Sequence, residues 1–253
     1  RGFSEIINYK LSGIDGHIRI NNYVSGRISI EEISRIDSRI KDISSDIEVA
    51  SPYIEKHALV RNGSLAEGII LYGVSDSSLK NIFQLHRFTS GPCTFSSKQS
   101  IIIGNKLAES LNVQVGDNIT IMNVEKMANE QILKAHNLTI INIFKTDFPE
   151  YDRLLAFIPL QAADIFFEMN NDVSGLILNV NNADNVESTN LKLSEAIGLY
   201  PYMTSTWKER HSGLLHWLTL YDIPIKIIMF FIGEIRKLLF IRGPYWMYVG
   251  CST

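Results

Sequence analysis

The order of hydrophobic patterns along the 253-residue chain restricts its fold more than any other feature. Strand-like and helix-like patterns alternate near both ends, over residues 17–47 and 160–206, and mainly strand-like segments lie between them. Such an arrangement predicts an α+β fold in which a β-rich subdomain is inserted into an α/β subdomain. The chain is 45% hydrophobic and 20% charged, which supplies enough apolar side chains for a sizeable core.

The first third contains a well-marked helix pattern. Isoleucines recur every three or four residues from Ser29 to Ile47, which predicts an amphipathic helix with Ser29 near its N-cap and Glu31 and Glu32 in its first turn. Ser51-Pro52 is expected to break this helix. The remaining predicted strands of this part are residues 17–21, 55–61 and 66–74, with Asn62-Gly63 as the turn of a hairpin.

The rest of the chain alternates between short strands and helices. Strands are predicted over residues 101–104, 118–123, 138–145 and 173–180, and extended segments over 154–159 and 200–206. Phe148-Pro149 is expected to break the structure before the first of these extended segments. Helices are predicted over residues 79–88, 105–111, 160–169, 182–197 and 207–221.

The sequence lacks the common catalytic and nucleotide-binding motifs. It has no GxxxxGK[ST], GxGxxG, HExxH or GxSxG sequence and no EF-hand loop. His211 and His216 are five residues apart and do not share a helix face, so solvent-exposed histidines are favoured over a metal site. Glu150 and Asp152 form only a weak candidate for a general acid and base. We therefore predict no catalytic residue, no metal site and no cofactor.

For several other residues, a structural role is favoured over a functional role. Phe166 and Phe167 are predicted to lie in the core, and Trp207 is predicted to be a structural plug rather than a partner contact. Cys93 and Cys251 are too few for a zinc cage and leave the redox compartment open. The net charge of −3 argues against a nucleic-acid partner, because such proteins usually carry a basic excess.

The two ends suggest a piece of a longer protein. The chain begins at Arg1 and has no apolar region of a signal peptide, which predicts a fragment or a processed product. Residues 223–233 form an apolar run of about half the roughly 20 residues that cross a membrane. Glu234, Arg236 and Lys237 interrupt it. The run is either a buried C-terminal helix or the start of a transmembrane helix.

An ordered series of short sequences resembles a known family. The series is GIDGHIRI, VASPYIEKHALV, GIILYGV, IIIGNKLAESLNVQVGDNITI, INIFKTDFPEYDRLLAFIPLQAADIFF, VSGLILNV and TSTWKERHSGLLHWLTL, between residues 13 and 220. Together these sequences are similar to the periplasmic domain of lipoprotein-releasing ABC transporter permeases. These permeases are the LolC/LolE family, within the MacB-like and FtsX-like permeases. The resemblance covers about residues 1–232.

The resemblance implies a domain organisation. Residues 1–85 and 153–220 would form a porter-like α/β subdomain, and residues 86–152 would form the inserted β-rich subdomain. Residues 221–233 would begin a transmembrane helix, and residues 234–253 are an atypical tail. In the full-length protein, two transmembrane helices would flank this periplasmic domain in the bacterial inner membrane, with their ends side by side on one face of the domain.

The resemblance also implies the partners. A separate ABC ATPase subunit would supply hydrolysis, and a paralogous permease or a second copy would complete the transporter. The cargo would be lipoproteins bound for the outer membrane, released toward a soluble periplasmic carrier. The chain itself would act by binding and conformational change and would not be an enzyme.

A hook between two strands is the family's site for contact with the carrier. It would fall here on residues 124–137, where Met127, Ile132 and Leu133 are the apolar side chains available for a partner. The segment has no proline or glycine at its tip, unlike a LolC-type hook, so a LolE-type contact with the cargo is the alternative. An ordinary solvated hairpin is an equally favoured reading.

Two further functions compete with lipoprotein release. Within the same superfamily, the chain could belong to a MacB-like efflux permease or an FtsX-like regulator of cell-wall hydrolases. From another class, a secreted hydrolase would use Glu150, Asp152 or a histidine and would require a polar cleft with converging carboxylates.

Overall fold

The computed structural model describes residues 12–43, 45–124, 135–198, 200–213 and 215. The strands are β1 (Ile18–Asn22), β2 (Ile47–Asn62), β3 (Leu65–Val74), β4 (Ser100–Gly104), β5 (Asn118–Asn123), β6 (Ala135–Phe144), β7 (Leu155–Pro159), β8 (Gly175–Val180) and β9 (Tyr202–Thr206). The α-helices are α2 (Ile30–Ile43), α3 (Asp76–Asn81), α4 (Asn105–Leu111), α6 (Pro149–Leu154), α7 (Leu160–Phe167), α8 (Val186–Ile197) and α9 (Trp207–Arg210). Short 3₁₀ turns span Leu85–Arg87 and Ala183–Asn185. The chain divides into two units, Arg1–Trp207 and Lys208–Thr253, and the description below concerns the first.

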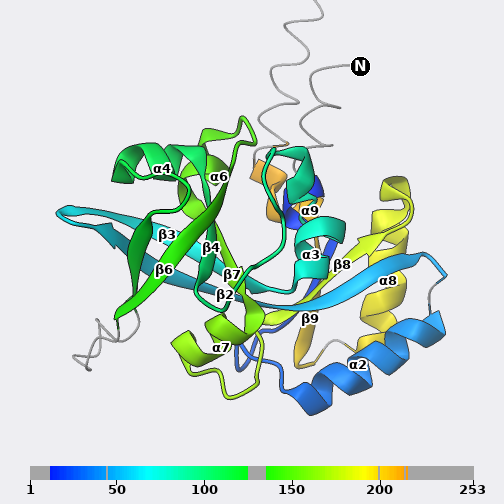
Figure 1. The fold of residues 1–253 in the computed structure, drawn as a ribbon. Helices are drawn as coiled ribbons and strands as arrows, with labels where there is room; N and C mark the ends of the chain where they lie inside the picture. The colour runs from blue at the N-terminus through cyan, green and yellow to red at the C-terminus, as the bar shows by residue number, and fades with distance from the viewer. Residues whose placement is uncertain (1–11, 44, 125–134, 199, 214, 216–253) are drawn as a thin grey trace, which may run out of the picture. The chain divides into compact units, whose positions relative to one another are not determined.

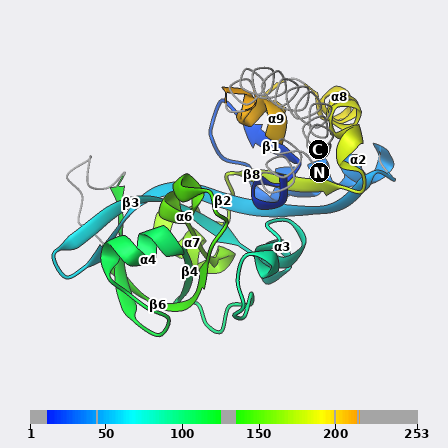
Figure 2. The same cartoon turned by 90° about the horizontal axis from the view of Figure 1, so that it is seen from above.

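The long strand β2 belongs to two groups of strands. Its first half, residues 47–53, pairs with β8, and β8 and β9 flank β1 in an antiparallel sheet of order β2-β8-β1-β9. Its second half, residues 54–62, pairs with β3 and, at residues 58–61, also with β5. In Figures 1 and 2, β2 runs from one group of elements to the other. A single strand therefore connects the two groups directly.

The second group closes into a ring of six strands. The order β3-β7-β4-β6-β5-β2 is completed by the pairing of β2 with β3. The pairs β3–β7 and β4–β6 are parallel, and the other pairs are antiparallel. Closure pairs every strand of the ring on both sides, which removes the exposed edges that invite unwanted strand addition.

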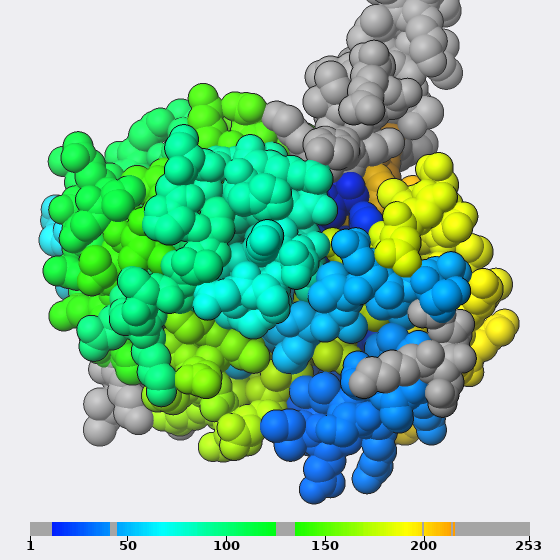
Figure 3. All heavy atoms as spheres, turned by 45° about the vertical axis from the view of Figure 1, so that its right-hand side comes forward, coloured from blue at the N-terminus to red at the C-terminus, as the bar shows by residue number. Residues whose placement is uncertain are grey.

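Helices α2 and α8 cover the β1–β8–β9 sheet. They lie side by side in Figure 1, and both reach the surface on the face shown in Figure 3. Ile36 and Ile40 of α2 are buried, as the isoleucine spacing predicts. Ser29 and Glu32 form a capping box, because the Ser29 N–H donates to Glu32 Oε2 at 2.8 Å and the Glu32 N–H donates to Ser29 Oγ at 3.3 Å. The predicted N-cap is confirmed.

Aromatic side chains of the ring strands β3, β6 and β7 pack with Phe83, which follows α3, in a core that also includes Ile177 of β8. The Phe157 ring lies 5.6 Å from Tyr72, 5.1 Å from Phe83 and 5.8 Å from Phe144, measured between ring centroids. Phe166 and Phe167 of α7 are also buried, as predicted for core residues. Aromatic pairs at these separations add favourable edge and offset contacts to the burial of their surface.

The predicted end of the first long helix is wrong. Helix α2 stops at Ile43, and Ile47 already belongs to β2, which continues through Ser51 and Pro52 without a break. Proline is tolerated there because residues 47–53 pair with β8 alone, which leaves the other side of the strand without a ladder. Ile47 thus matched the helical spacing by coincidence.

Two other predictions need correction. Proline at the first turn starts helix α6 at Pro149, where the sequence suggested only a break before an extended segment. The helix predicted over residues 79–88 is two short pieces, since α3 begins after the Ser75 N-cap and Gln84 adopts a left-handed φ of 46°. Each correction concerns a short element.

The mixed α+β class is confirmed, and α4 and β5 have the predicted bounds. The boundaries of the porter-like and β-rich subdomains stay a prediction. Among the helices of the described residues, none is long and apolar enough to span a membrane. The predicted start of a transmembrane helix at 221–233, the tail at 234–253 and the paired ends fall outside the described residues.

Candidate functional site

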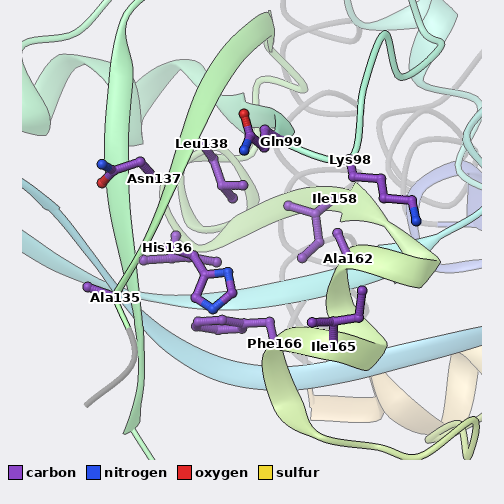
Figure 4. Close-up of a pocket in the computed structure, with 11 residues that line it drawn as sticks. Lys98, Gln99, Ala135, His136, Asn137, Leu138, Ile158, Ala162, Ile165 and Phe166 are labelled. Atoms are coloured by element: carbon purple, nitrogen blue, oxygen red, sulfur yellow. The ribbon is translucent and has the colours of Figure 1, made fainter.

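A pocket of about 320 Å³ lies between helix α7 and strands β5 and β6. We call it the α7 pocket. Its lining residues are Lys98, Gln99, Ile121, Ala135, His136, Asn137, Leu138, Ile158, Ala162, Ile165 and Phe166. Figure 4 shows how the side chains of β6 and α7 face one another across it.

The local sequence explains why the pocket forms here. Strands β5 and β6 pair antiparallel up to Met122 and Ala135, so their ladder ends beside the pocket. Pro159 ends β7, and α7 starts at the next residue, which places Ala162, Ile165 and Phe166 on the pocket side of the helix. The pocket therefore sits where an antiparallel pair ends and a helix follows a strand directly.

The pocket combines an apolar floor with a polar rim. Ile121, Leu138 and Ile158 are buried, whereas Lys98 and Gln99 are exposed. The His136 ring packs edge-on against Phe166 at 5.0 Å between centroids, as Figure 4 shows. Ile165 is 59% exposed, which is high for a large aliphatic side chain. This arrangement suits an apolar side chain or hydrocarbon chain with an acidic group beside it.

A smaller apolar pocket of about 220 Å³ lies along another face of the same helix. Leu160, Gln161 and Asp164 of α7 line it, together with residues of α2, β2 and the loop 171–173. Ile30, at the start of α2, also lines this pocket and is 62% exposed. Helix α7 thus lines two pockets, with the exposed Ile165 beside one and the exposed Ile30 of α2 beside the other, and such exposed apolar side chains are typical of a binding surface.

The residues predicted for partner binding lie outside the described residues. Met127, Ile132 and Leu133 belong to residues 125–134, which connect β5 to β6. The α7 pocket lies beside the ends of those same two strands. Sequence reasoning did not find this pocket, because its walls come from segments that are far apart in the chain. The exposure of Ile165 is visible only in the structure, because its sequence position fits a buried helix face as well as an exposed one.

The weak acid–base candidate of Glu150 and Asp152 is not a converging pair. Asp152 is 2% exposed, and its Oδ1 accepts hydrogen bonds from the Thr146 N–H at 2.7 Å and the Thr146 hydroxyl at 2.8 Å. Glu150 is exposed on the first turn of α6. Asp152 therefore holds the loop before α6 in place. Within the part of the chain that the structure describes, no three His, Cys, Asp or Glu side chains lie close enough to hold a metal ion.

Glu32, Tyr202 and Cys93 have shifted pKa values, and all three lie outside the α7 pocket. The hydrogen bond from the Ser29 N–H, aided by the Tyr202 hydroxyl, lowers the pKa of Glu32. Burial and the hydrogen bond to Glu32 raise the pKa of Tyr202 to about 12. Burial raises the pKa of the Cys93 thiol. These shifts follow from packing and capping, and none of them points to acid–base chemistry.

Comparison with known proteins identifies the fold and its relatives. The family model of the MacB-like periplasmic core domain matches residues 2–196. The chain is 23% identical over 189 residues to the lipoprotein-releasing system transmembrane protein LolC of Neisseria meningitidis serogroup B. This alignment covers 73% of the present chain and 45% of LolC. The chain is 24% identical over 208 residues to the lipoprotein-releasing system transmembrane protein LolE of Haemophilus influenzae. This second alignment covers 80% of the present chain and 49% of LolE. The chain thus spans about half the length of these relatives.

Two solved structures share the fold. The periplasmic region of MacB from Actinobacillus actinomycetemcomitans has a TM-score of 0.51 at 12% identity, covering 83% of this chain and 97% of that one. The extracellular domain of the ABC-type transporter YknZ from Gram-positive bacteria has a TM-score of 0.50 at 15% identity, covering 75% and 99%. Since the family model covers most of the chain and both structures share its mixed α+β architecture, the chain belongs to the family of MacB-like periplasmic core domains.

Proposed function

We propose that the chain is the periplasmic core domain of an ABC transporter permease that releases lipoproteins from the bacterial inner membrane. The observation that carries the proposal is the similarity to LolC and LolE proteins over 73% and 80% of the chain. A separate ATPase subunit would drive the transporter, and a paralogous permease or a second copy would complete it. The domain would act through binding and movement, with no bond chemistry of its own.

The contact surface for partners would be the α7 pocket together with the segment 125–134. The pocket supports this role because its floor is apolar and Ile165 is exposed at its edge. Lys98 lies at the rim and adds a positive charge, which would favour an acidic group next to an apolar anchor on the partner. The same surface would serve a soluble carrier in a LolC-type protein or the lipoprotein cargo in a LolE-type protein.

Photo-crosslinking in the full-length permease tests the proposal. A photoreactive amino acid would replace Met127, Ile132, Leu133 or Ile165 in turn, and crosslinked products would be identified from intact cells. The matched control is Leu191, which is 62% exposed on helix α8 and does not line the α7 pocket. We expect crosslinks from the first four positions and none from position 191.

The identity of the product decides between the alternatives. A crosslink to the soluble carrier would support a LolC-type role, and a crosslink to lipoproteins would support a LolE-type role. If the protein is expressed and folded but crosslinks to neither, the lipoprotein proposal fails. A crosslink to an efflux adaptor or to a cell-wall hydrolase would instead favour the MacB-like or the FtsX-like alternative.

A further inference from the structure

A buried arginine connects three separate parts of the fold. Arg19 on β1 is 7% exposed, and its Nη1 donates to Glu55 Oε2 on β2 at 2.5 Å. Its Nη2 donates to the Asp15 carboxylate, in the helical residues 12–15, and to the Tyr72 hydroxyl on β3 at 3.0 Å. We call these residues and Tyr53, described next, the Arg19 cluster.

Two aromatic rings hold the guanidinium group. Its central carbon lies 5.2 Å from the centroid of the Tyr53 ring and 5.5 Å from that of Tyr72. A cation over an aromatic face is attracted by the ring quadrupole, more strongly where water is excluded. Tyr53 is itself fixed, because Asn21 Nδ2 donates to its hydroxyl at 2.7 Å.

The cluster lies where β2 changes partners. Tyr53 pairs with Gly175 of β8, and the next residue, Ile54, pairs with Gly73 of β3. Arg19 belongs to the β1–β8–β9 sheet, whereas Glu55 and Tyr72 belong to the six-stranded ring. The Arg19 side chain therefore spans the junction that β2 makes through its backbone.

Stability alone is a weak reason for a charged group at this junction. Burying an ion pair removes both partners from water, so apolar side chains of similar volume often stabilise a fold equally well. The Arg19 Nε is also buried without a hydrogen-bond partner among the described residues, which costs further free energy. The cluster fixes the relative orientation of its members, because the planar guanidinium binds its partners at set angles. Apolar packing would not fix this orientation.

We propose that Arg19 is a positioning residue that sets the orientation of the six-stranded ring relative to the β1–β8–β9 sheet. The guanidinium engages both sides of the β2 junction and the helical residues 12–15, so a change in any one contact alters the angle between the two groups of strands. Transport depends on this orientation, and that last step rests on the proposed function.

The orientation can be measured without any transport assay. Spin labels at Val115, in the turn before β5 of the ring, and Leu191, on α8, would report the distance between the two groups of strands in the full-length protein, with its native cysteines, Cys93 and Cys251 among them, replaced by serine. Both labelled side chains are more than half exposed, so labelling disturbs little. We expect a narrow distance distribution in the parent protein and one at least twice as broad in Arg19→Met.

Two further variants separate positioning from stability. The combination Arg19→Met, Asp15→Asn and Glu55→Gln removes all three charges, so no charge is left buried alone, and we expect it to melt close to the parent while the distribution stays broad. Arg19→Lys keeps a buried cation but lacks the planar fork, and we expect an intermediate breadth. A narrow distance distribution in a folded triple variant would overturn the proposal. If the triple variant does not fold, a narrow distance distribution in Arg19→Lys would overturn it.

Reconstitution with the ATPase subunit then tests the consequence for transport. In the triple variant, we expect ATP hydrolysis within twofold of the parent and lipoprotein release at least tenfold lower. Unchanged release together with a broadened distribution would refute the link to transport. If the parent protein itself releases no lipoprotein, the proposed function fails, and the distance measurement still decides the role of Arg19.

Discussion

At the residue scale, the capping box of α2 links a surface carboxylate to stability and pH. The Ser29 N–H and the Tyr202 hydroxyl donate to the Glu32 carboxylate and lower its pKa, so the unfolded chain binds its proton more readily than the folded chain. The stability from Glu32 is therefore present above its ordinary pKa of 4.5 and is lost as the pH falls through the lowered value.

We expect Glu32→Gln to lower the free energy of unfolding by about 0.5–1 kcal/mol at pH 7, since it keeps the shape of the cap but loses the charge. The difference from the parent should be smaller at pH 3, which lies below the ordinary pKa of 4.5. Urea denaturation at both pH values measures it. Glu31→Gln is the control, because Glu31 is exposed in the same turn. An equal loss at both pH values would show that the charge of Glu32 contributes nothing.

A second residue-scale prediction concerns the start of α4. A Cβ atom on Gly104 would lie 2.2 Å from the backbone oxygen of Asp152, which cannot move without displacing α6. We expect Gly104→Ala to destabilise the protein by about 1–3 kcal/mol, the range for overpacked cores. Gly68→Ala is the matched control, because nothing lies within 4 Å of its Cβ position and its φ is ordinary. Similar urea midpoints for the two variants would contradict this account.

At the element scale, α2 supports the C-terminal end of α8. Arg39 Nη1 donates to the carbonyl of Ile197 at 3.0 Å and to that of Ala196 at 3.4 Å. These carbonyls carry the negative end of the helix dipole and lack partners within the helix. We expect Arg39→Ala to lower the free energy of unfolding by about 0.5–1 kcal/mol and to speed amide exchange in the last turn of α8. The exposed Arg35→Ala, on the same helix, should do neither.

The same scale shows which elements a sequence can predict. Helix α4 and strand β5 matched their predicted bounds because clear local patterns mark them, with Gly104 before the helix and Val115-Gly116-Asp117 before the strand. The course of β2 through Pro52 was missed because it depends on which side of the strand is paired. The α7 pocket was missed for a related reason, since contacts between distant segments create it. Local patterns predict elements, and tertiary pairing decides their ends and the hollows between them.

At the scale of the whole first unit, the shared strand β2 should make the two groups of strands unfold together. Loosening either group frays one half of a strand whose other half belongs to the other group. Leu178→Ala on β8 and Ile103→Ala on β4 remove fully buried side chains from the sheet and from the ring, respectively. Each should cost about 2–5 kcal/mol, and each should lower amide protection by a similar factor in β1 and in β6, as measured by native-state hydrogen exchange. If each variant instead weakened protection only in its own group, the two groups would be independent folding units.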